Sequence, residues 1–174
     1  MNLQKKFVNP QTLNGFYKAK IKKKNFENEI NKIEKLLLKS KKPVMILGGG
    51  LKYSKSEILL GKLLKKTKLP LVTTWSGCDL IDHNNSDYIG NIGVYGSRAA
   101  NFTIQNSDLV ICLGSRLDTR VTGGVPKNFA RNAKKIVIDI DKFELNKQRG
   151  LNIDLKINHD LQYFLKSLIK SNLN

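Results

Sequence analysis

One continuous apolar run limits the fold of this chain more than any other segment. Residues 109–113 read Leu-Val-Ile-Cys-Leu, and all five are hydrophobic. This pattern is typical of a strand covered on both faces, as in a parallel sheet between two layers of helices. A loop with three glycines, two arginines and one aspartate follows at residues 114–124. Open α/β sheets bind ligands at the carboxyl ends of their strands, so we expect this loop to contact a ligand.

Other segments alternate between strand and helix patterns. The predicted strands occupy residues 44–47, 71–73, 109–113, 135–141 and 152–157, the last at a sheet edge. The predicted helices begin near Phe26, at a capping box of Ser54 and Glu57, after Ser97, at Phe143 and after Asp160. This alternation predicts a three-layer α/β fold, with a five- to six-stranded parallel Rossmann-like sheet and helices on both faces.

The first part of the chain has a different character. Residues 1–24 show little periodicity and end in a basic run, so we interpret them as a linker. Residues 25–174 hold all the predicted strands and helices, and their number suits a single domain. The sequence therefore predicts one α/β domain preceded by a tether.

The charge of the chain is strongly basic. Lysine and arginine number 31 against 14 aspartate and glutamate residues, a formal net charge of +17 at pH 7. Such a charge favours electrostatic binding to nucleic acid or anionic surfaces. The cations are mostly lysines spread over predicted helix faces, without a dense arginine block or interleaved aromatic residues. We therefore favour solvated lysines over specific nucleic-acid binding.

Cysteine content and hydropathy bear on the compartment. Cys78 and Cys112 are the two cysteines, and they indicate neither a disulfide framework nor a thiolate metal site. No apolar run approaches the length that crosses a bilayer, and no apolar segment typical of a secretory signal follows the first residues. We expect a cytoplasmic protein that does not enter a membrane.

Three glycine-bearing loops lie at or near predicted strand ends, at residues 48–50, 93–96 and 114–124. Glycine lets backbone amides approach a phosphate, and the helix after Ser97 adds partial positive charge, so residues 93–96 are the best candidate to grip a diphosphate. None of the loops matches the G-x-G-x-x-G dinucleotide fingerprint. Each one taken singly is also explained by tight-turn geometry.

Charged residues near the same strand ends leave alternatives open. Arg116 and Arg120 offer planar forks for a phosphate, but Asp118 between them could instead pair with Arg116 inside the loop. Asp139 and Asp141 alternate along a strand end, so at most one of them is expected to contact a ligand directly. Either a ribose contact or helix capping would explain an aspartate there.

Residue types that support catalysis are not grouped in the sequence. His83 and His159 have no evident carboxylate partner or metal-ligand spacing, and we expect both at the surface. The sequence has no nucleophile elbow, P-loop lysine or clustered His, Cys and Asp set. We therefore predict no catalytic residue and no metal ligand.

Several blocks of sequence carry a family resemblance. Residues 93–123, GVYGSRAANFTIQNSDLVICLGSRLDTRVTG, are followed by FARNAKKIVIDIDKFELNK at 129–147. Upstream lie KKPVMILGGG at 41–50 and PLVTTWSGCDLIDHNNSDYIGNIG at 70–93, and INHDLQYFL lies downstream at 157–165. Over residues 41–168 the chain resembles the central domain of thiamine-diphosphate-dependent enzymes, above all acetolactate (acetohydroxyacid) synthase.

The resemblance implies a larger enzyme that joins or decarboxylates 2-keto acids. It implies a sheet of the DHS-like NAD/FAD-binding type, and residues 1–24 would link it to an N-terminal pyrimidine-binding domain. Thiamine diphosphate and Mg²⁺ would be held by N- and C-terminal catalytic domains of the same chain, which these 174 residues do not contain. The full enzyme would be a homodimer or tetramer, and this domain alone would not catalyse.

The resemblance also implies a cofactor for this domain: FAD, or ADP in some relatives, or no ligand in a purely architectural domain. Matching positions give a cofactor-facing set of Gly49, Gly50, Thr73, Thr74, Gly93, Gly96, Gly114, Arg116, Asp118, Arg120, Asp139 and Asp141. The chain departs from the family pattern at Val94, Tyr95, Leu117 and Thr119. A related carboligase or decarboxylase is therefore an alternative to acetolactate synthase.

Two other classes of function are weighed against this one. A basic nucleic-acid-binding α/β protein would account for the net charge. A sirtuin-like deacylase would use a similar sheet, but it would need a histidine at the cleft and, usually, four zinc-binding cysteines. Two cysteines and no suitably placed histidine disfavour the deacylase.

Overall fold

A computed structural model describes residues 7–15, 24–147 and 150–171. The predicted linker at residues 1–24 lies mostly outside the described residues. Within it, residues 7–15 are exposed and contain a short 3₁₀ turn, η2 (Pro10–Thr12), which Asn9 caps.

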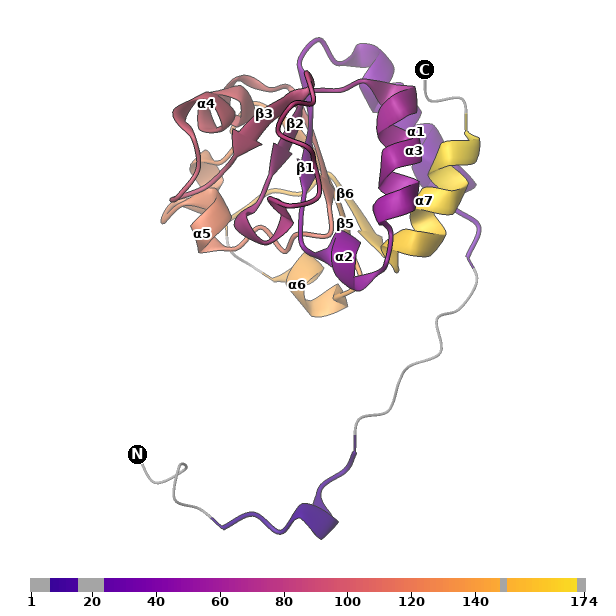
Figure 1. Cartoon of the computed structure of the whole chain (residues 1–174), viewed down its shortest axis with the longest axis vertical. Helices are drawn as coiled ribbons and strands as arrows, with labels where there is room; N and C mark the ends of the chain where they lie inside the picture. The colour runs from indigo at the N-terminus through magenta and orange to yellow at the C-terminus, as the bar shows by residue number, and fades with distance from the viewer. Residues whose placement is uncertain (1–6, 16–23, 148–149, 172–174) are drawn as a thin grey trace.

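The centre of the fold is a six-stranded parallel sheet in the order β3-β2-β1-β4-β5-β6 (Figure 1). Its strands are β1 (Pro43–Leu47), β2 (Leu71–Thr73), β3 (Tyr88–Asn91), β4 (Leu109–Leu113), β5 (Lys134–Asp139) and β6 (Leu155–Asn158). All five residues of β4 are buried, because helices cover both faces of the strand. The parallel sheet predicted from the sequence is confirmed.

Helices cover the two faces of this sheet. They are α1 (Glu27–Lys39), α2 (Gly50–Tyr53), α3 (Glu57–Thr67), α4 (Arg98–Asn106), α5 (Thr119–Thr122), α6 (Lys142–Asn146) and α7 (Leu161–Lys170). Figure 1 shows α1, α3 and α7 together on one side and α4 on the other. The three-layer architecture is therefore also confirmed.

Two hydrophobic clusters fill the space between the layers. On one face, strand residues such as Ile111 pack against α1, α2, α3 and α7, including Phe164 of α7. On the other face, the neighbouring Cys112 packs with Ala100 and Ile104 of α4. Successive strand residues point to opposite faces, so each strand contributes to both clusters.

Asp108, directly before β4, fixes the start of that strand to the segment before β1. Its carboxylate accepts hydrogen bonds from the Ser40 hydroxyl and from the amides of Lys41 at 2.8 Å and Lys42 at 3.0 Å. The amino ends of two central strands are therefore joined by one side chain.

The caps predicted for two helices are confirmed, and a third is wrong. Ser97 accepts from the Ala100 amide at 3.1 Å, and Asp160 accepts from Gln162. The capping box at Ser54 does not form, since the single turn of α2 ends there and α3 begins at Glu57 after Ser56.

The structure corrects some predicted strand positions. β3 is not among the predicted strands, because its residues are only half-buried at the sheet edge and carry no apolar pattern. β5 ends at Asp139 rather than at residue 141, and β6 begins at Leu155 rather than at residue 152. None of the helices in the described part of the chain has both the length and the apolar character needed to span a membrane.

Candidate functional site

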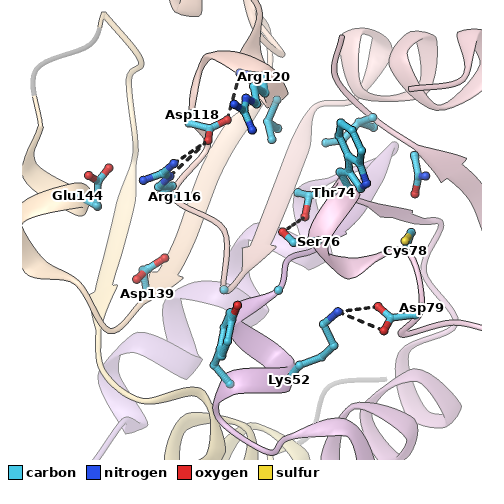
Figure 2. A pocket seen from close by; sticks show the side chains of 18 of the residues that line it. Lys52, Thr74, Ser76, Cys78, Asp79, Arg116, Asp118, Arg120, Asp139 and Glu144 are labelled. Atoms are coloured by element: carbon cyan, nitrogen blue, oxygen red, sulfur yellow. Dashed lines mark hydrogen bonds and ion pairs between the residues drawn. The ribbon is translucent and has the colours of Figure 1, made fainter. Parts of the chain in front are cut away.

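A cavity of about 1190 Å³ opens at the carboxyl ends of the parallel strands. The loops after β1, β2, β3, β4 and β5 form its walls, and Figure 2 shows side chains around it. Nine of the twelve positions predicted to face a cofactor line this cavity: Gly49, Gly50, Thr74, Gly114, Arg116, Asp118, Arg120, Asp139 and Asp141. The topology thus brings together residues up to 92 positions apart, from 49 to 141.

Glycines let the loops after β1 and β4 touch. A Cβ added to Gly48 would lie 2.2 Å from the carbonyl oxygen of Gly114, and one added to Gly50 would lie 2.8 Å from the Cα of Gly114. The Gly50 amide donates to the Gly114 oxygen at 2.9 Å. Gly114 has a φ of +67°, which favours glycine. Tight packing between loops therefore explains these glycines, and it also leaves bare backbone at the cavity wall.

Gly93 and Gly96 do not line the large cavity. A Cβ added to Gly93 would lie 2.2 Å from the Arg120 oxygen, and the Val94 amide donates to that oxygen at 2.9 Å. The Gly93 amide donates to Asn101, and the Gly96 amide donates to the Gly93 oxygen. Because these amides are already used, the loop offers few donors for the diphosphate that we expected there.

Thr73 is buried and also lies away from the cavity. Its hydroxyl forms hydrogen bonds with Tyr88, at 3.0 Å, and with Asn91 on the neighbouring strand. Thr74 is the next residue and does line the cavity, with its hydroxyl 3.5 Å from that of Ser76. Alternation along the chain thus places only one of the two threonines at the cavity.

Asp118 organises the loop after β4 (Figure 2). One carboxylate oxygen accepts from the Arg116 guanidinium at 3.1 and 3.3 Å, and the other accepts from the Arg120 amide at 3.0 Å. The internal pair that the sequence left open is therefore present. The Arg116 side chain is 61% exposed, and exposed ion pairs contribute at most ~1 kcal/mol, so a ligand phosphate could replace this contact at small cost.

Asp139 and Asp141 both line the cavity, contrary to the expectation that alternation would separate them. The strand ends at Asp139, so strand geometry no longer applies two residues later. Asp141 accepts from the amides of Phe143 and Glu144 and caps α6, as one of the two sequence interpretations held. Burial, together with the nearby charge of Asp141, raises the pKa of the Asp139 carboxyl.

Sequence reasoning missed several residues of the cavity wall. Lys52 and Asp79 form an ion pair of 2.8 Å, and Trp75 packs edge-on against Tyr95 with ring centroids 5.0 Å apart. Trp75 is the single tryptophan of the chain and lies two residues after a predicted strand, a signal that could have placed it here.

The sequence profile described as "Thiamine pyrophosphate enzyme, central domain" matches residues 30–168. The chain belongs to this family of thiamine pyrophosphate enzyme central domains.

Similar proteins agree with this assignment. The acetolactate synthase large subunit of Cyanidium caldarium is 38% identical over 143 residues, which are 82% of this chain and 24% of that protein. A probable acetolactate synthase large subunit of Methanococcus aeolicus is 37% identical, over 82% of this chain and 23% of that protein. The acetolactate synthase isozyme 2 large subunit of Escherichia coli K12 is 36% identical, over 80% of this chain and 25% of that protein. This central domain therefore spans about a quarter of the length of these relatives.

Neither histidine of the central domain lines the large cavity. His83 packs edge-on against Tyr88, and His159 packs against Phe26 and Tyr163. In the described ranges, no three His, Cys, Asp or Glu side chains are grouped so that they could hold a metal ion. The geometry gives no support to a sirtuin-like deacylase.

Proposed function

We propose that the cavity at the carboxyl edge binds FAD or ADP, and that the chain acts as the central domain of a larger enzyme of the acetolactate synthase type. The observation that supports the proposal is that nine of the positions predicted to face a cofactor line one cavity. Its volume, about 1190 Å³, is somewhat above the ~300–1,000 Å³ of small-molecule sites, so an extended nucleotide suits it.

The chemistry of the cavity wall fits such a ligand. Lys52, Arg116 and Arg120 supply positive charge for a diphosphate, and the Arg116 guanidinium is a bidentate donor. Carboxylates from Asp79, Asp118, Asp139, Asp141 and Glu144 line the same space. Carboxylates are acceptors for hydroxyl groups, of which FAD has many along its ribityl chain and ribose.

We assign separate tasks to the residues around the ligand. Arg116 would exchange its bond to Asp118 for one to a phosphate oxygen, while Asp118 keeps the Arg120 amide in place. Asp139 would accept a ribose hydroxyl. The exposed rings of Trp75 and Tyr95 would cover a flat heterocycle at the mouth. FAD would bring a flavin ring, and ADP only the adenine nucleotide.

The whole enzyme is a further part of the proposal. Thiamine diphosphate and Mg²⁺ would be bound by other domains of a longer chain, which would form a homodimer or tetramer in the cytoplasm. The central domain would hold the thiamine-binding domains in position and would supply no catalytic residue. The relatives are about four times as long as the part that this chain matches, which supports that arrangement.

Exposed apolar side chains around the cavity support contact with further protein. Tyr53, Trp75, Val94, Tyr95, Ile140 and Phe143 are exposed, and each lines the cavity or lies next to a residue that does. We call these six residues the apolar collar. Exposed patches of this kind mark interaction surfaces, so we propose that neighbouring domains of the enzyme cover them.

Thermal unfolding with added nucleotides tests the proposed ligand. FAD at a hundred times its dissociation constant should add about 2.7 kcal/mol to the free energy of unfolding. For a domain of this size that is a rise in Tm of roughly 5–11 °C. ADP should act similarly, and FMN, which lacks the adenosine half, separates binding through the adenine nucleotide from binding through the flavin.

The variant Arg116→Gln should reduce the rise in Tm, and Lys62→Gln on the exposed face of α3 is the control with the same loss of charge. Quenching of the single tryptophan, Trp75, should follow the same titration. A Tm that no nucleotide changes would overturn nucleotide binding and leave the chain a purely architectural domain.

A further inference from the structure

A second cavity, of about 290 Å³, lies at the other end of the strands, where their amino ends are. It opens at the amino ends of β5 and β6, next to Lys134, Lys135 and Asp154. Lys127 and Arg131, from the segment between α5 and β5, also line it. We call it the amino-edge cavity, and we call the large cavity at the carboxyl ends of the strands the carboxyl-edge cavity. The two share no lining residue, so a ligand bound in the amino-edge cavity would be independent of the proposed nucleotide site.

Lys135 is the unusual member of this cavity. It is the second residue of β5, and only 5% of it is exposed. Its ammonium donates to the Ala133 carbonyl oxygen at 2.9 Å, and the described residues supply no other partner. An ammonium has three N–H donors, so two of them have no acceptor from the described part of the protein. Leaving a buried charge in this state is costly.

The single carboxylate at the cavity is already in use. One oxygen of Asp154 accepts from the Lys134 ammonium at 2.8 Å, and the other accepts from the Lys135 backbone amide at 2.9 Å. No ion pair joins Asp154 to the Lys135 ammonium within the described ranges. Burial lowers the pKa of Lys135; the charge of Asp154 acts against this shift, and the charge of Lys134 acts with it.

Two further cationic side chains, Lys127 and Arg131, add positive charge to the amino-edge cavity. Lys127 and Arg131 are exposed, and among residues 7–15, 24–147 and 150–171 neither has an ion-pair partner. Four cationic side chains thus face one carboxylate, an excess of three positive charges in a space of about 290 Å³. The carboxyl-edge cavity differs, with three cationic and five acidic side chains.

From this placement we propose that the amino-edge cavity binds a small phosphate anion, either orthophosphate or the phosphate group of a monoester. The buried Lys135 ammonium would donate to it from the inner wall of the cavity, and the exposed Arg131 guanidinium would donate to it from the rim. Arginine suits phosphate because its planar fork donates two parallel hydrogen bonds. The volume admits a phosphate group but excludes a dinucleotide.

The experiment is an NMR titration of the full 174-residue chain in a buffer without phosphate. Orthophosphate should shift the amide signals of residues 131–135 in a saturable way, and should leave those of Gly49 and Gly114 unchanged. Glycerol phosphate, added in a parallel titration, shows whether a monoester binds more tightly than the free anion. A short single-stranded oligonucleotide is the third ligand.

Two variants and one control make the result specific. Lys135→Met removes the buried ammonium but keeps a side chain of similar length, and it should raise the apparent Kd for orthophosphate at least tenfold. Arg131→Gln alters only the exposed rim and should weaken binding several-fold even if Lys135→Met were to unfold. Lys62→Met lies on α3, removes one charge and should leave the Kd unchanged.

Three outcomes would overturn the proposal. The first is the absence of saturable shifts, which would mean that water alone satisfies Lys135. The second is an equal loss of affinity in all three variants, which would mean non-specific attraction to a basic chain. The third is binding of the oligonucleotide without binding of either phosphate.

Discussion

At the scale of single residues, the side chains that matter most satisfy backbone donors at strand ends. Asp108 accepts three hydrogen bonds from the segment that leads into β1. Asp118 and Asp141 cap α5 and α6 on the wall of the cavity. Backbone amides that end in a loop must find acceptors, and short aspartates supply them locally. The loops that form the cavity are therefore held in place by carboxylates.

Replacing Asp108 tests this at one position. Burial raises the pKa of Asp108, but the hydrogen bonds from Ser40, Lys41 and Lys42 outweigh it and hold the pKa below its ordinary value. A depressed pKa means that the stabilisation is present above the unfolded-state pKa and is lost as the pH falls through the folded-state pKa. Asp108→Asn should therefore lose about 1–2 kcal/mol at pH 7.

Urea unfolding at several pH values measures this loss. The difference between wild type and Asp108→Asn should shrink below about pH 4, where carboxylates begin to protonate in the unfolded chain. Asp87→Asn is the control, because the Asp87 carboxylate accepts no hydrogen bond among the described residues. A difference that persists unchanged at low pH would show that the charge of Asp108 is not the cause.

At the scale of elements, the contact between the loops after β1 and β4 decides the shape of the cavity. Gly48→Ala would place a Cβ 2.2 Å from a backbone oxygen of Gly114, and neither loop can yield by turning a side chain. We expect a loss of about 1–3 kcal/mol in the free energy of unfolding, as for other overpacked sites. The nucleotide-dependent rise in Tm should fall as well.

Gly61→Ala is the matched control for this substitution. Gly61 lies inside α3, and a Cβ there would meet nothing within 4 Å. Alanine in a helix interior should stabilise the protein by about 0.5–1 kcal/mol. Thermal unfolding should therefore give a lower Tm for Gly48→Ala and a higher Tm for Gly61→Ala. Equal destabilisation of both variants would contradict the tight contact between the loops.

The same elements show how far the sequence could predict the fold and the site. Buried strands such as β4 are evident because both of their faces are apolar. The edge strand β3 was missed, since its half-buried residues carry no such pattern. Glycine and aspartate after the strands indicated the edge where the cavity lies, but the sequence could not show that the Gly93 loop uses its amides internally. Lys52 and Asp79 were missed because only the folded chain brings them together.

At the scale of the whole molecule, the two sheet edges differ in charge and in apolar exposure. The amino edge holds a compact cavity of positive charge, whereas the carboxyl edge holds a large cavity with an acidic balance. The apolar collar surrounds the large cavity, and Phe143 and Tyr53 within it are 88% and 89% exposed. A surface of this kind suits contact with further protein of the same enzyme.

Substitutions in the apolar collar should change surface contacts without changing the stability of the fold. Ile140→Thr combined with Phe143→Ser should change the free energy of unfolding by less than about 0.5 kcal/mol, because both side chains are exposed. The same variant should reduce binding of the dye ANS to the folded chain and reduce self-association in sedimentation velocity. Leu38→Ser combined with Ile58→Thr removes exposed apolar groups from α1 and α3 instead, so it is the matched control.

The comparison of the two double variants decides whether the collar is a distinct surface. The collar residues lie around one cavity mouth, so their contribution to dye binding should exceed that of two apolar residues on helix surfaces. If both variants lower dye binding and self-association equally, the collar is ordinary exposed surface and the proposed contact with neighbouring domains loses its support. If the collar variant alone does so while FAD still raises the Tm, then Ile140 and Phe143 serve protein contact and are not needed for nucleotide binding.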